Sequence, residues 1–373
     1  MSARRSAVLA LACLLTVGDV AHAQRRTENV VLVTIDGARY QEVFGGLDLE
    51  ILQSTTKTPV ESLPVHAQFW AGSAEERRAK LMPFFWGTLM TQGSIAGNPA
   101  LGSTVRITNG HRFSYPGYSE ILTGEANDAA ITSNDPIQNP FETVLEFVRR
   151  RLGLGPRQVA AFTSWGAFTG IAEHVKGTIT TNAGLQRVEI DTPAVGQLNE
   201  LQFEVLSPWE MVRPDAFTFR LGLAYLKAHK PRLFYLALDE TDDWAHDGKY
   251  DLMLRSYAQF DRYLRELWQW LESDEQYRGK TTLIVTTDHG RGRTTADWRS
   301  HGRDIEGAQD IWMAFVSPDS PRRGEWRDAE PLFQNQVAAT VAQLLGLDFR
   351  EARPTAGLPI SSLWTGSVSG PTR

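Results

Sequence analysis

Cysteine is almost absent from this chain of 373 residues, which contains only Cys13. That cysteine lies within an apolar run near the N-terminus, and the rest of the chain has none. Without cysteine, the folded part can form no disulfide bonds and can offer no thiolate to a metal ion. Any metal site must therefore use oxygen and nitrogen donors.

Apolar runs long enough to cross a bilayer are also missing. The run Ala7–Val17 is well short of the ~20 residues that a spanning helix needs. Arg4 and Arg5 precede it, and Ala21-His22-Ala23 supplies the small residues that a signal peptidase reads. We therefore expect residues 1–23 to be a signal peptide, the protein to be periplasmic or secreted, and the mature chain to lack a transmembrane segment.

Basic residues form no tract with interleaved aromatic residues, and the formal net charge is −6. A docking surface for nucleic acid is therefore not expected. The chain is 42% hydrophobic and 22% charged and has 11 Trp, which is typical of a folded globular protein. We expect one large domain over residues 24–365 and a flexible tail over 366–373.

Short β-branched and apolar runs alternate with segments in which apolar residues recur three and four apart. The predicted strands are Asn29–Ile35, Val159–Thr163, Leu233–Leu238, Thr282–Thr287 and Ile311–Ser317. The predicted helices are Phe141–Leu152, Asp215–His229, Leu252–Leu271 and Gln334–Leu345. The alternation predicts an α/β fold with a mainly parallel central sheet covered by helices on both faces. Residues 40–109 and 176–214 depart from it, and we expect them to be irregular insertions that cap the site.

Side chains that can bind metal follow three of the predicted strands. Asp36, within Thr34-Ile35-Asp36-Gly37, follows the first strand, Asp242 and His246 follow the third, and Asp288-His289-Gly290 follows the fourth. Because ligands gather at the carboxyl ends of parallel strands, we expect these residues to share one location. Each segment has a simpler interpretation, since Asp-Gly and Asp-His-Gly also occur in ordinary turns.

Asp242 and His246 are four residues apart, so one helical turn would place both on the same face, able to share an ion. Their acidic neighbours keep other choices open: Asp239, Glu240, Asp243 and Asp247. A solvated acidic loop is the alternative for the whole segment. A later pair, His301-Gly302, could supply another ligand or belong to an ordinary loop.

Ser114 is followed by Pro116 and by a helix-like run that ends at Thr123-Gly124. Proline is tolerated in the first turn of a helix and glycine commonly ends one. Ser114 could therefore be a simple N-cap. It could equally be a nucleophile, because the free N–H groups at a helix N-terminus favour an alkoxide and a phosphoryl oxygen.

Taken together and in this order, the segments resemble the alkaline phosphatase superfamily, especially its nucleotide pyrophosphatase/phosphodiesterase-like branch. The resemblance covers most of the chain from Asn29 to about Leu347. It implies that Asp242, His246 and His301 hold one divalent metal ion. It also implies a second ion held by Asp36, Asp288, His289 and the Ser114 oxygen. Zinc is the first candidate for these oxygen and nitrogen donors, with Mn²⁺ and Fe as alternatives.

The resemblance implies an exported, metal-dependent hydrolase of small phosphoric esters, either monoesters or diesters, that acts through a phosphoseryl intermediate on Ser114. A sulfatase-like or phosphonate hydrolase of the same superfamily is one alternative. Sulfatases have arginine four residues after their nucleophile, where this chain has Tyr118. A non-catalytic metal-binding or ligand-binding protein on the same fold is an alternative of another class.

Relatives use an asparagine about twenty residues after the nucleophile to bind a phosphoryl oxygen, and the resemblance places Asn134 in this role. Asn139 is a rival, and Asn134 could instead belong to a turn. Arg112, just before the nucleophile, is a candidate for substrate binding. His111 and Arg39 are further candidates. The natural substrate and the oligomeric state are not predicted.

Overall fold

A computed structural model describes residues 26–364 of the chain. An eight-stranded sheet has the order β10-β2-β9-β7-β1-β6-β4-β5, and a second, three-stranded sheet has the order β11-β3-β8. The strands are β1 (Asn29–Ile35), β2 (Ser94–Ala96), β3 (Val105–Arg106), β4 (Val159–Thr163), β5 (Thr180–Ala183), β6 (Leu233–Leu238), β7 (Thr281–Thr286), β8 (Asp310–Ile311), β9 (Met313–Val316), β10 (Gly324–Glu325) and β11 (Leu332–Phe333). The predicted signal peptide and tail lie outside the described residues.

Strands β7, β1, β6, β4 and β5 run parallel in the middle of the large sheet, with Val33 paired to Leu236 and to Val285. The fold class predicted from the sequence is thus confirmed. All seven residues of β1 are buried, because helices cover both faces of the sheet. Buried parallel strands need side chains that tolerate an apolar setting on either side, which explains their β-branched and apolar composition.

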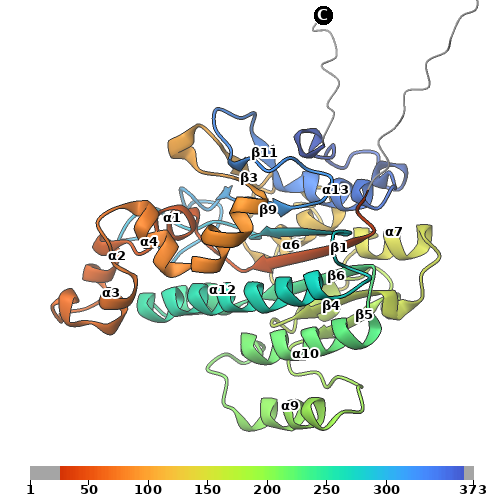
Figure 1. Cartoon of the computed structure of the whole chain (residues 1–373), viewed down its shortest axis with the longest axis horizontal. Coiled ribbons are helices and arrows are strands. Elements are labelled where there is room, and N and C mark those ends of the chain that lie inside the picture. The colour runs from red at the N-terminus through yellow and green to blue at the C-terminus, as the bar shows by residue number, and fades with distance from the viewer. Residues whose placement is uncertain (1–25, 365–373) are drawn as a thin grey trace, which may run out of the picture.

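The helices are α1 (Tyr40–Gly45), α2 (Leu49–Ser54), α3 (Pro64–Phe69), α4 (Ala74–Leu81), α5 (Met90–Gln92), α6 (Ser114–Thr123), α7 (Val144–Arg151), α8 (Phe168–Ile171), α9 (Pro193–Glu204), α10 (Asp215–His229), α11 (Glu240–His246), α12 (Tyr250–Ser273) and α13 (Val337–Leu344). Figure 1 shows α10 and α12 on one side of the sheet, with α7 and α13 on the other. Alternate residues of β1 belong to the cores on opposite faces of the sheet. Val31 and Val33 join the core beneath α12, whereas Val30 and Leu32 join the core beneath α13.

One predicted strand differs from the structure. The run Ile311–Ser317 divides at Trp312 into β8, which joins the small sheet, and β9, which joins the large one. The indole of Trp312 donates a hydrogen bond to the Ala38 carbonyl at 3.1 Å, and this contact holds the point of division. β9 also runs antiparallel to β7. Hydrophobicity alone carries no signal for the direction of a buried strand or for a change of sheet.

The two segments expected to be insertions contain regular structure. Residues 40–109 include five short helices, a π-helical stretch at Phe85–Leu89, and β2, which pairs with the large sheet. Residues 176–214 include the edge strand β5 and α9, which lies beyond α10 at the periphery of the molecule (Figure 1). Among residues 26–364, no helix combines the length and the apolar character that crossing a membrane requires.

Candidate active site

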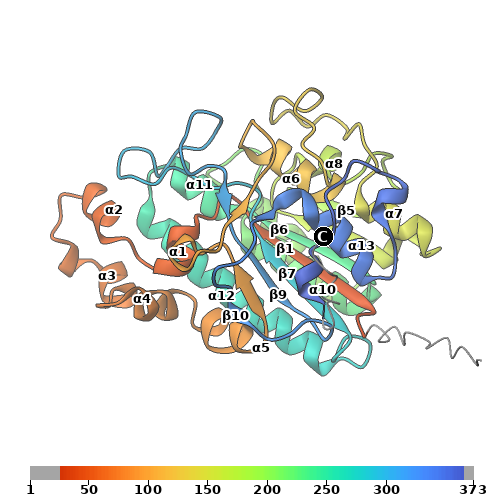
Figure 2. The same cartoon turned by 90° about the horizontal axis from the view of Figure 1, so that it is seen from above.

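Ser114 is the first residue of α6, and its side chain is buried. Phe113 precedes it in extended conformation and supplies no side-chain cap, so Ser114 is not the N-cap of this helix. Its hydroxyl oxygen lies 3.4 Å from Nε2 of His289. Figure 2 shows α6 and α11 flanking the end of β1, which is the edge of the sheet where parallel strands present their carboxyl ends.

Asp36, Asp288 and His289 form a fully buried group beside Ser114. His289 Nε2 lies 3.4 Å from an oxygen of Asp36 and 3.5 Å from an oxygen of Asp288. The three candidate ligand atoms all lie within 4.8 Å of one another. The end of β1 and the end of β7, neighbours in the sheet, thus deliver their polar residues to one point.

This buried group contains unpaired acceptor atoms that face each other. Asp36 Oδ1 and Asp288 Oδ2 have no hydrogen-bond partner. The other oxygens are bonded, to the Tyr118 hydroxyl at 2.8 Å and to the Gly37 N–H at 3.0 Å respectively. His289 Nδ1 donates to a backbone carbonyl at 2.9 Å, so its Nε2 presents a lone pair to the carboxylates. Buried lone pairs that converge on one point suit the binding of a cation.

The ionisation of the two carboxyl groups leads to the same conclusion. Burial, followed by the charge of Asp242, raises the pKa of Asp36 well above its ordinary value. Burial, followed by the charge of Asp36, does the same to the pKa of Asp288. Both groups therefore resist ionisation unless positive charge is added between them. A divalent ion would supply that charge, and the residues fit one.

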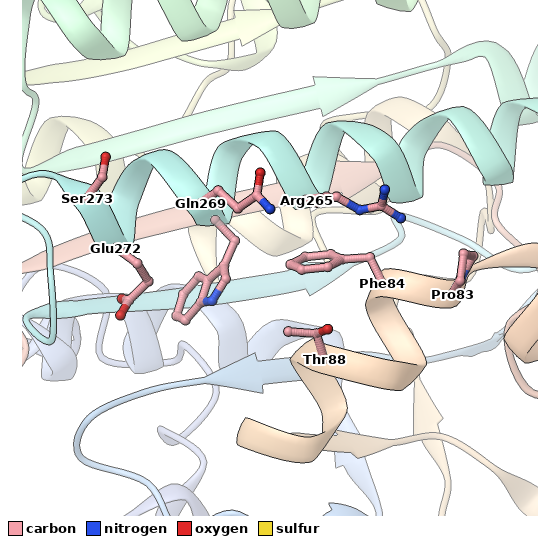
Figure 3. Close-up of a pocket in the computed structure, with 8 residues that line it drawn as sticks. Pro83, Phe84, Thr88, Arg265, Gln269, Glu272 and Ser273 are labelled. Atoms are coloured by element: carbon pink, nitrogen blue, oxygen red, sulfur yellow. The ribbon is translucent and has the colours of Figure 1, made fainter.

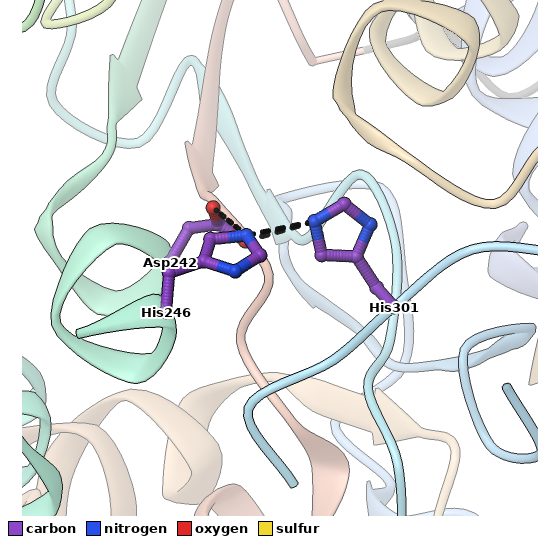
Figure 4. A group of neighbouring side chains, drawn as sticks. All are labelled: Asp242, His246 and His301. Carbon is purple, nitrogen blue, oxygen red and sulfur yellow. Dashed lines mark hydrogen bonds and ion pairs between the residues drawn. The ribbon is translucent and has the colours of Figure 1, made fainter. Parts of the chain in front are cut away.

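A second group lies nearer the solvent and combines Asp242 and His246 of α11 with His301 from the loop after β7 (Figure 4). His246 Nε2 lies 3.1 Å from Asp242 Oδ2 and 2.9 Å from His301 Nε2. Burial lowers the pKa of His301 to about 2, so this imidazole stays neutral and can act as a ligand. The histidine nitrogens and the carboxylate oxygen thus face a common centre.

The two groups adjoin each other. Asp242 Oδ1 lies 3.6 Å from His289 Nε2, and the rings of His289 and His301 have centroids 4.1 Å apart. Two-metal hydrolases hold their ions ~3.5–4 Å apart. The structure therefore brings together all seven residues predicted to be metal ligands, as two neighbouring donor sets with Ser114 at the buried one.

Comparison with known protein families finds a match over residues 52–346 to the model of type I phosphodiesterase/nucleotide pyrophosphatase. The chain belongs to this family. The superfamily resemblance predicted from the sequence is thereby confirmed. Asp36 lies before the matched residues, and the structure rather than the family match places it in the site.

Solved structures with the same fold include three hydrolases. The alkaline phosphatase PafA is 11% identical with a TM-score of 0.59, over 91% of this chain and 99% of that one. A phosphonate monoester hydrolase from Silicibacter pomeroyi is 14% identical with a TM-score of 0.57, over 93% and 78%. An inactive form of murine ectonucleotide pyrophosphatase/phosphodiesterase 5 is 14% identical with a TM-score of 0.54, over 91% and 100%. A search of curated proteins finds none that matches.

In this family member, a buried arginine that the sequence did not single out lies inside the site. The guanidinium of Arg291 forms an ion pair with Asp242 Oδ1 and also donates to the Asp242 backbone carbonyl at 3.1 Å. It also donates to the backbone carbonyl of Arg299, two residues before His301. Burial alone would raise the pKa of Asp242, but Arg291 and the nearby imidazoles outweigh it and hold that pKa well below its ordinary value. The only sequence signal was its place directly after Asp288-His289-Gly290.

The acidic neighbours of Asp242 lie in other environments. Burial, together with the charges of Asp243 and Asp36, raises the pKa of Asp239 well above the ordinary value. Glu240 accepts a hydrogen bond from the Asp215 N–H at 3.0 Å, away from the imidazoles. Of the acids in this segment, only Asp242 joins His246 and His301 within the described donor sets.

The two candidate asparagines have different environments. Asn134 is exposed, and its Oδ1 accepts the backbone N–H of Tyr115 at 2.9 Å, which places its amide beside the N-terminus of α6. Asn139 is buried, and its amide bonds to the Ile171 carbonyl and the Phe141 N–H at 3.1 Å each. Asn139 is therefore engaged in loop structure, and Asn134 alone adjoins Ser114.

The candidate basic residues also have different environments. Arg39 is wholly buried and paired with Glu42 at 3.4 Å, so it belongs to the core under α1. Arg112 and His111 remain partly exposed next to Ser114.

A surface pocket of about 600 Å³ lies elsewhere, between α12 and residues 83–88, and Figure 3 shows its lining. It contains none of the site residues.

Proposed function

We propose that the protein is an exported hydrolase of phosphoric esters that uses two metal ions and acts through Ser114. Family membership and fold indicate a phosphoester hydrolase. The single observation that supports the finer proposal is the convergence of unpaired oxygens of Asp36 and Asp288 on His289 Nε2, with the Ser114 hydroxyl 3.4 Å from that nitrogen. These donors would hold a cation beside the proposed nucleophile.

Each donor set has the composition for one divalent ion. Asp36, Asp288, His289 and the Ser114 oxygen would hold the buried ion, and Asp242, His246 and His301 the outer one. Bound there, the ions would lower the pKa of a hydroxyl or water and neutralise developing negative charge on the ester oxygens. Carboxylate and imidazole donors without thiolate favour zinc, and also suit Mn²⁺ or Fe.

We propose a reaction in two displacements. Ser114 Oγ loses its proton and forms a bond to phosphorus as the bond from phosphorus to the leaving oxygen breaks, and the proton passes to the leaving oxygen, which gives phosphoserine and an alcohol. Water then attacks the same phosphorus, the bond to Oγ breaks, and Ser114 recovers a proton. Ser114 begins α6, so the positive end of this helix dipole can stabilise the phosphoryl oxygens. We assign the Asn134 amide nitrogen the role of donor to a nonbridging oxygen, because Asn134 Oδ1 is held at the N-terminus of α6.

The alternative chemistries are less well supported by the geometry. At the position where sulfatases have arginine, Tyr118 is buried and donates its hydroxyl to Asp36, so no positive charge is present there. A purely structural protein would not need unpaired carboxylate oxygens, which are costly without a ligand. We further propose that residues 24–365 form one catalytic domain, and that residues 1–23 direct its export.

The deciding experiment replaces the nucleophile and measures turnover and metal content together. Ser114→Ala should lower the rate by about a thousandfold or more while nearly two ions per chain remain bound. Ser119→Ala is the matched control, because it removes another buried hydroxyl from the same helix. Substrates should include an aryl phosphate, a phosphate diester, a phosphonate and a sulfate. Full activity of Ser114→Ala would refute the assignment.

A further inference from the structure

Helix α11 carries two of the three donors of the outer ion site, Asp242 and His246 (Figure 4). It has only 7 residues, and a helix this short is not stable on its own in water. Its position must therefore come from contacts with the rest of the protein. Two buried polar residues, Asp215 and Thr241, supply directional contacts of this kind.

Asp215 caps the N-terminus of α11. Its Oδ1 accepts the backbone N–H of Asp239 at 2.9 Å, and its Oδ2 accepts that of Glu240 at 3.2 Å. Asp239 itself supplies no side-chain cap, so Asp215 satisfies N–H groups at the start of the helix that have no partner within it. The contact is reciprocal, because Glu240 Oε1 accepts the backbone N–H of Asp215, the first residue of α10, at 3.0 Å. The two helices thus cap each other.

Asp215 is itself fixed to the large sheet. Ser164, the residue after β4, donates its hydroxyl to Asp215 Oδ1 at 2.6 Å. The backbone N–H of Ser164 donates to the carbonyl of Ala237 in β6 at 2.9 Å. Ser164 and Asp215 are both buried, where hydrogen bonds are stronger than in water. The start of α11 is therefore held relative to the ends of β4 and β6.

Thr241 joins α11 to the segment that carries Asp36. Its hydroxyl donates to the backbone carbonyl of Asp36 at 2.6 Å, and Thr241 is 1% exposed. A threonine in a helix commonly donates to the carbonyl of the preceding turn, but this bond reaches 205 residues back along the chain. The backbone N–H of Asp36 donates in turn to the Leu238 carbonyl at 2.8 Å. Residues 238–241 thus hold the main chain of Asp36 through both its N–H and its carbonyl.

The Thr241 hydrogen bond links the two donor sets. Asp36 belongs to the buried set, and Asp242, the residue after Thr241, belongs to the outer one. β1 is paired to a strand on either side, whereas α11 is a short helix, so loss of the link should displace the outer donors more than the buried ones. Removal of a side chain that orients a metal ligand commonly lowers metal affinity about 10- to 100-fold.

We propose that Asp215 and Thr241 are positioning residues that hold the outer ion site at a fixed distance from the buried one. This proposal rests on the proposed function, because it concerns the second of the two ions. Neither side chain belongs to a donor set, and both act through the placement of α11. A protein that lacks either contact should bind the outer ion more weakly and keep the buried one.

The test is a calorimetric titration of the chelated protein with zinc. The binding step that His246→Ala removes identifies the outer ion. Thr241→Val keeps the volume of the side chain and removes its hydroxyl, so it should weaken binding of the outer ion about tenfold or more and that of the buried ion less than about threefold. Asp215→Asn, which removes one of two acceptors, should also weaken the outer ion. Thr241→Ser keeps the hydroxyl and should bind both ions as the wild type does.

Thr281→Val is the matched control, because Thr281 is also a buried threonine that donates to a backbone carbonyl, that of Tyr277 at 2.8 Å. It is the first residue of β7, at the opposite end of that strand from the site. Thr281→Val should lower the stability of the chelated protein in urea but leave the affinity for the outer ion unchanged. Equal weakening of the outer ion by Thr281→Val, or unchanged affinity in Thr241→Val or Asp215→Asn, would overturn the positioning role and leave the hydrolase intact. A wild-type protein that binds no zinc would instead refute the proposed function.

Discussion

Replacement of Arg291 by methionine should destabilise the metal-free protein strongly. The guanidinium is the buried cation in contact with Asp242, whose side chain is 11% exposed, and it also bonds to two backbone carbonyls. Removing one member of a buried pair leaves an uncompensated charge, which costs about 3–5 kcal/mol of unfolding free energy. Methionine has a similar volume and an apolar stem. The loss of unfolding free energy would therefore come from the missing charge rather than from a cavity.

Metal should reduce this loss, because an ion bound by Asp242 replaces the missing positive charge. Urea unfolding of both proteins, first with chelator and then with saturating zinc, measures the difference directly. A ligand at a hundred times its Kd adds about 2.7 kcal/mol to the unfolding free energy of either protein, and this common gain leaves the difference between them unchanged. We expect zinc to make the difference in unfolding free energy between wild type and Arg291→Met smaller than it is with chelator. Arg220→Met is the control. It breaks an exposed pair with Glu266, at 46% and 39% side-chain exposure, and should cost about 1 kcal/mol or less. A chelated Arg291→Met protein as stable as the wild type would refute the reasoning.

Three further predictions concern the site and its supports. Tyr118→Phe should weaken the buried metal site about 10-fold or more, measured by metal titration, because the hydroxyl that orients Asp36 is lost; unchanged affinity would contradict this role. Burial alone would raise the pKa of Glu325, but the hydrogen bonds from Arg78 and Asn98 outweigh it, and the pKa in the folded protein is lowered. The Glu325 carboxylate therefore stabilises the fold above pH about 4.3, the ordinary pKa of glutamate in the unfolded chain. This stabilisation is lost as the pH falls through the lowered pKa of the folded protein. Glu325→Gln should therefore cost about 1 kcal/mol in urea unfolding at pH 7 and little near pH 3, whereas an equal cost at both values would exclude a charge effect. Exhaustive chelation should abolish hydrolysis and readdition of zinc should restore it, and full activity without metal would exclude the two-metal proposal.

The central elements follow closely from the sequence. Hydrophobic runs predicted β1, β4 and β6 at their observed bounds, and β7 within one residue, because buried parallel strands are almost wholly apolar. The helical period predicted α10 at its observed bounds. The strand ends then placed Asp36 and Asp288 together, since parallel neighbours present their carboxyl ends at one edge.

Other features depend on contacts that one sequence cannot display. Arg291 has no pattern of its own, and only the folded structure shows its guanidinium against Asp242. The preference for Asp242 over Asp239 rested on spacing, whereas the structure shows that Asp242 and not Asp239 lies with His246 and His301. The strand break at Trp312 depends on a hydrogen bond to Ala38, more than 270 residues earlier in the chain.

Gly117 has a consequence for how such a site can diversify. A Cβ atom at this position would lie 2.4 Å from the carbonyl oxygen of Asp288, so α6 touches the loop of Asp288 backbone to backbone. Main-chain contact therefore fixes the distance between Ser114 and the donor set of Asp36, Asp288 and His289. Replacement of side chains elsewhere would leave that distance unchanged. Surrounding loops are free to change and acquire new substrates while the reacting centre keeps its dimensions. The three solved structures compared above share the fold at only 11–14% identity to this chain while their names give different activities, which is the outcome that such a fixed spacing would permit.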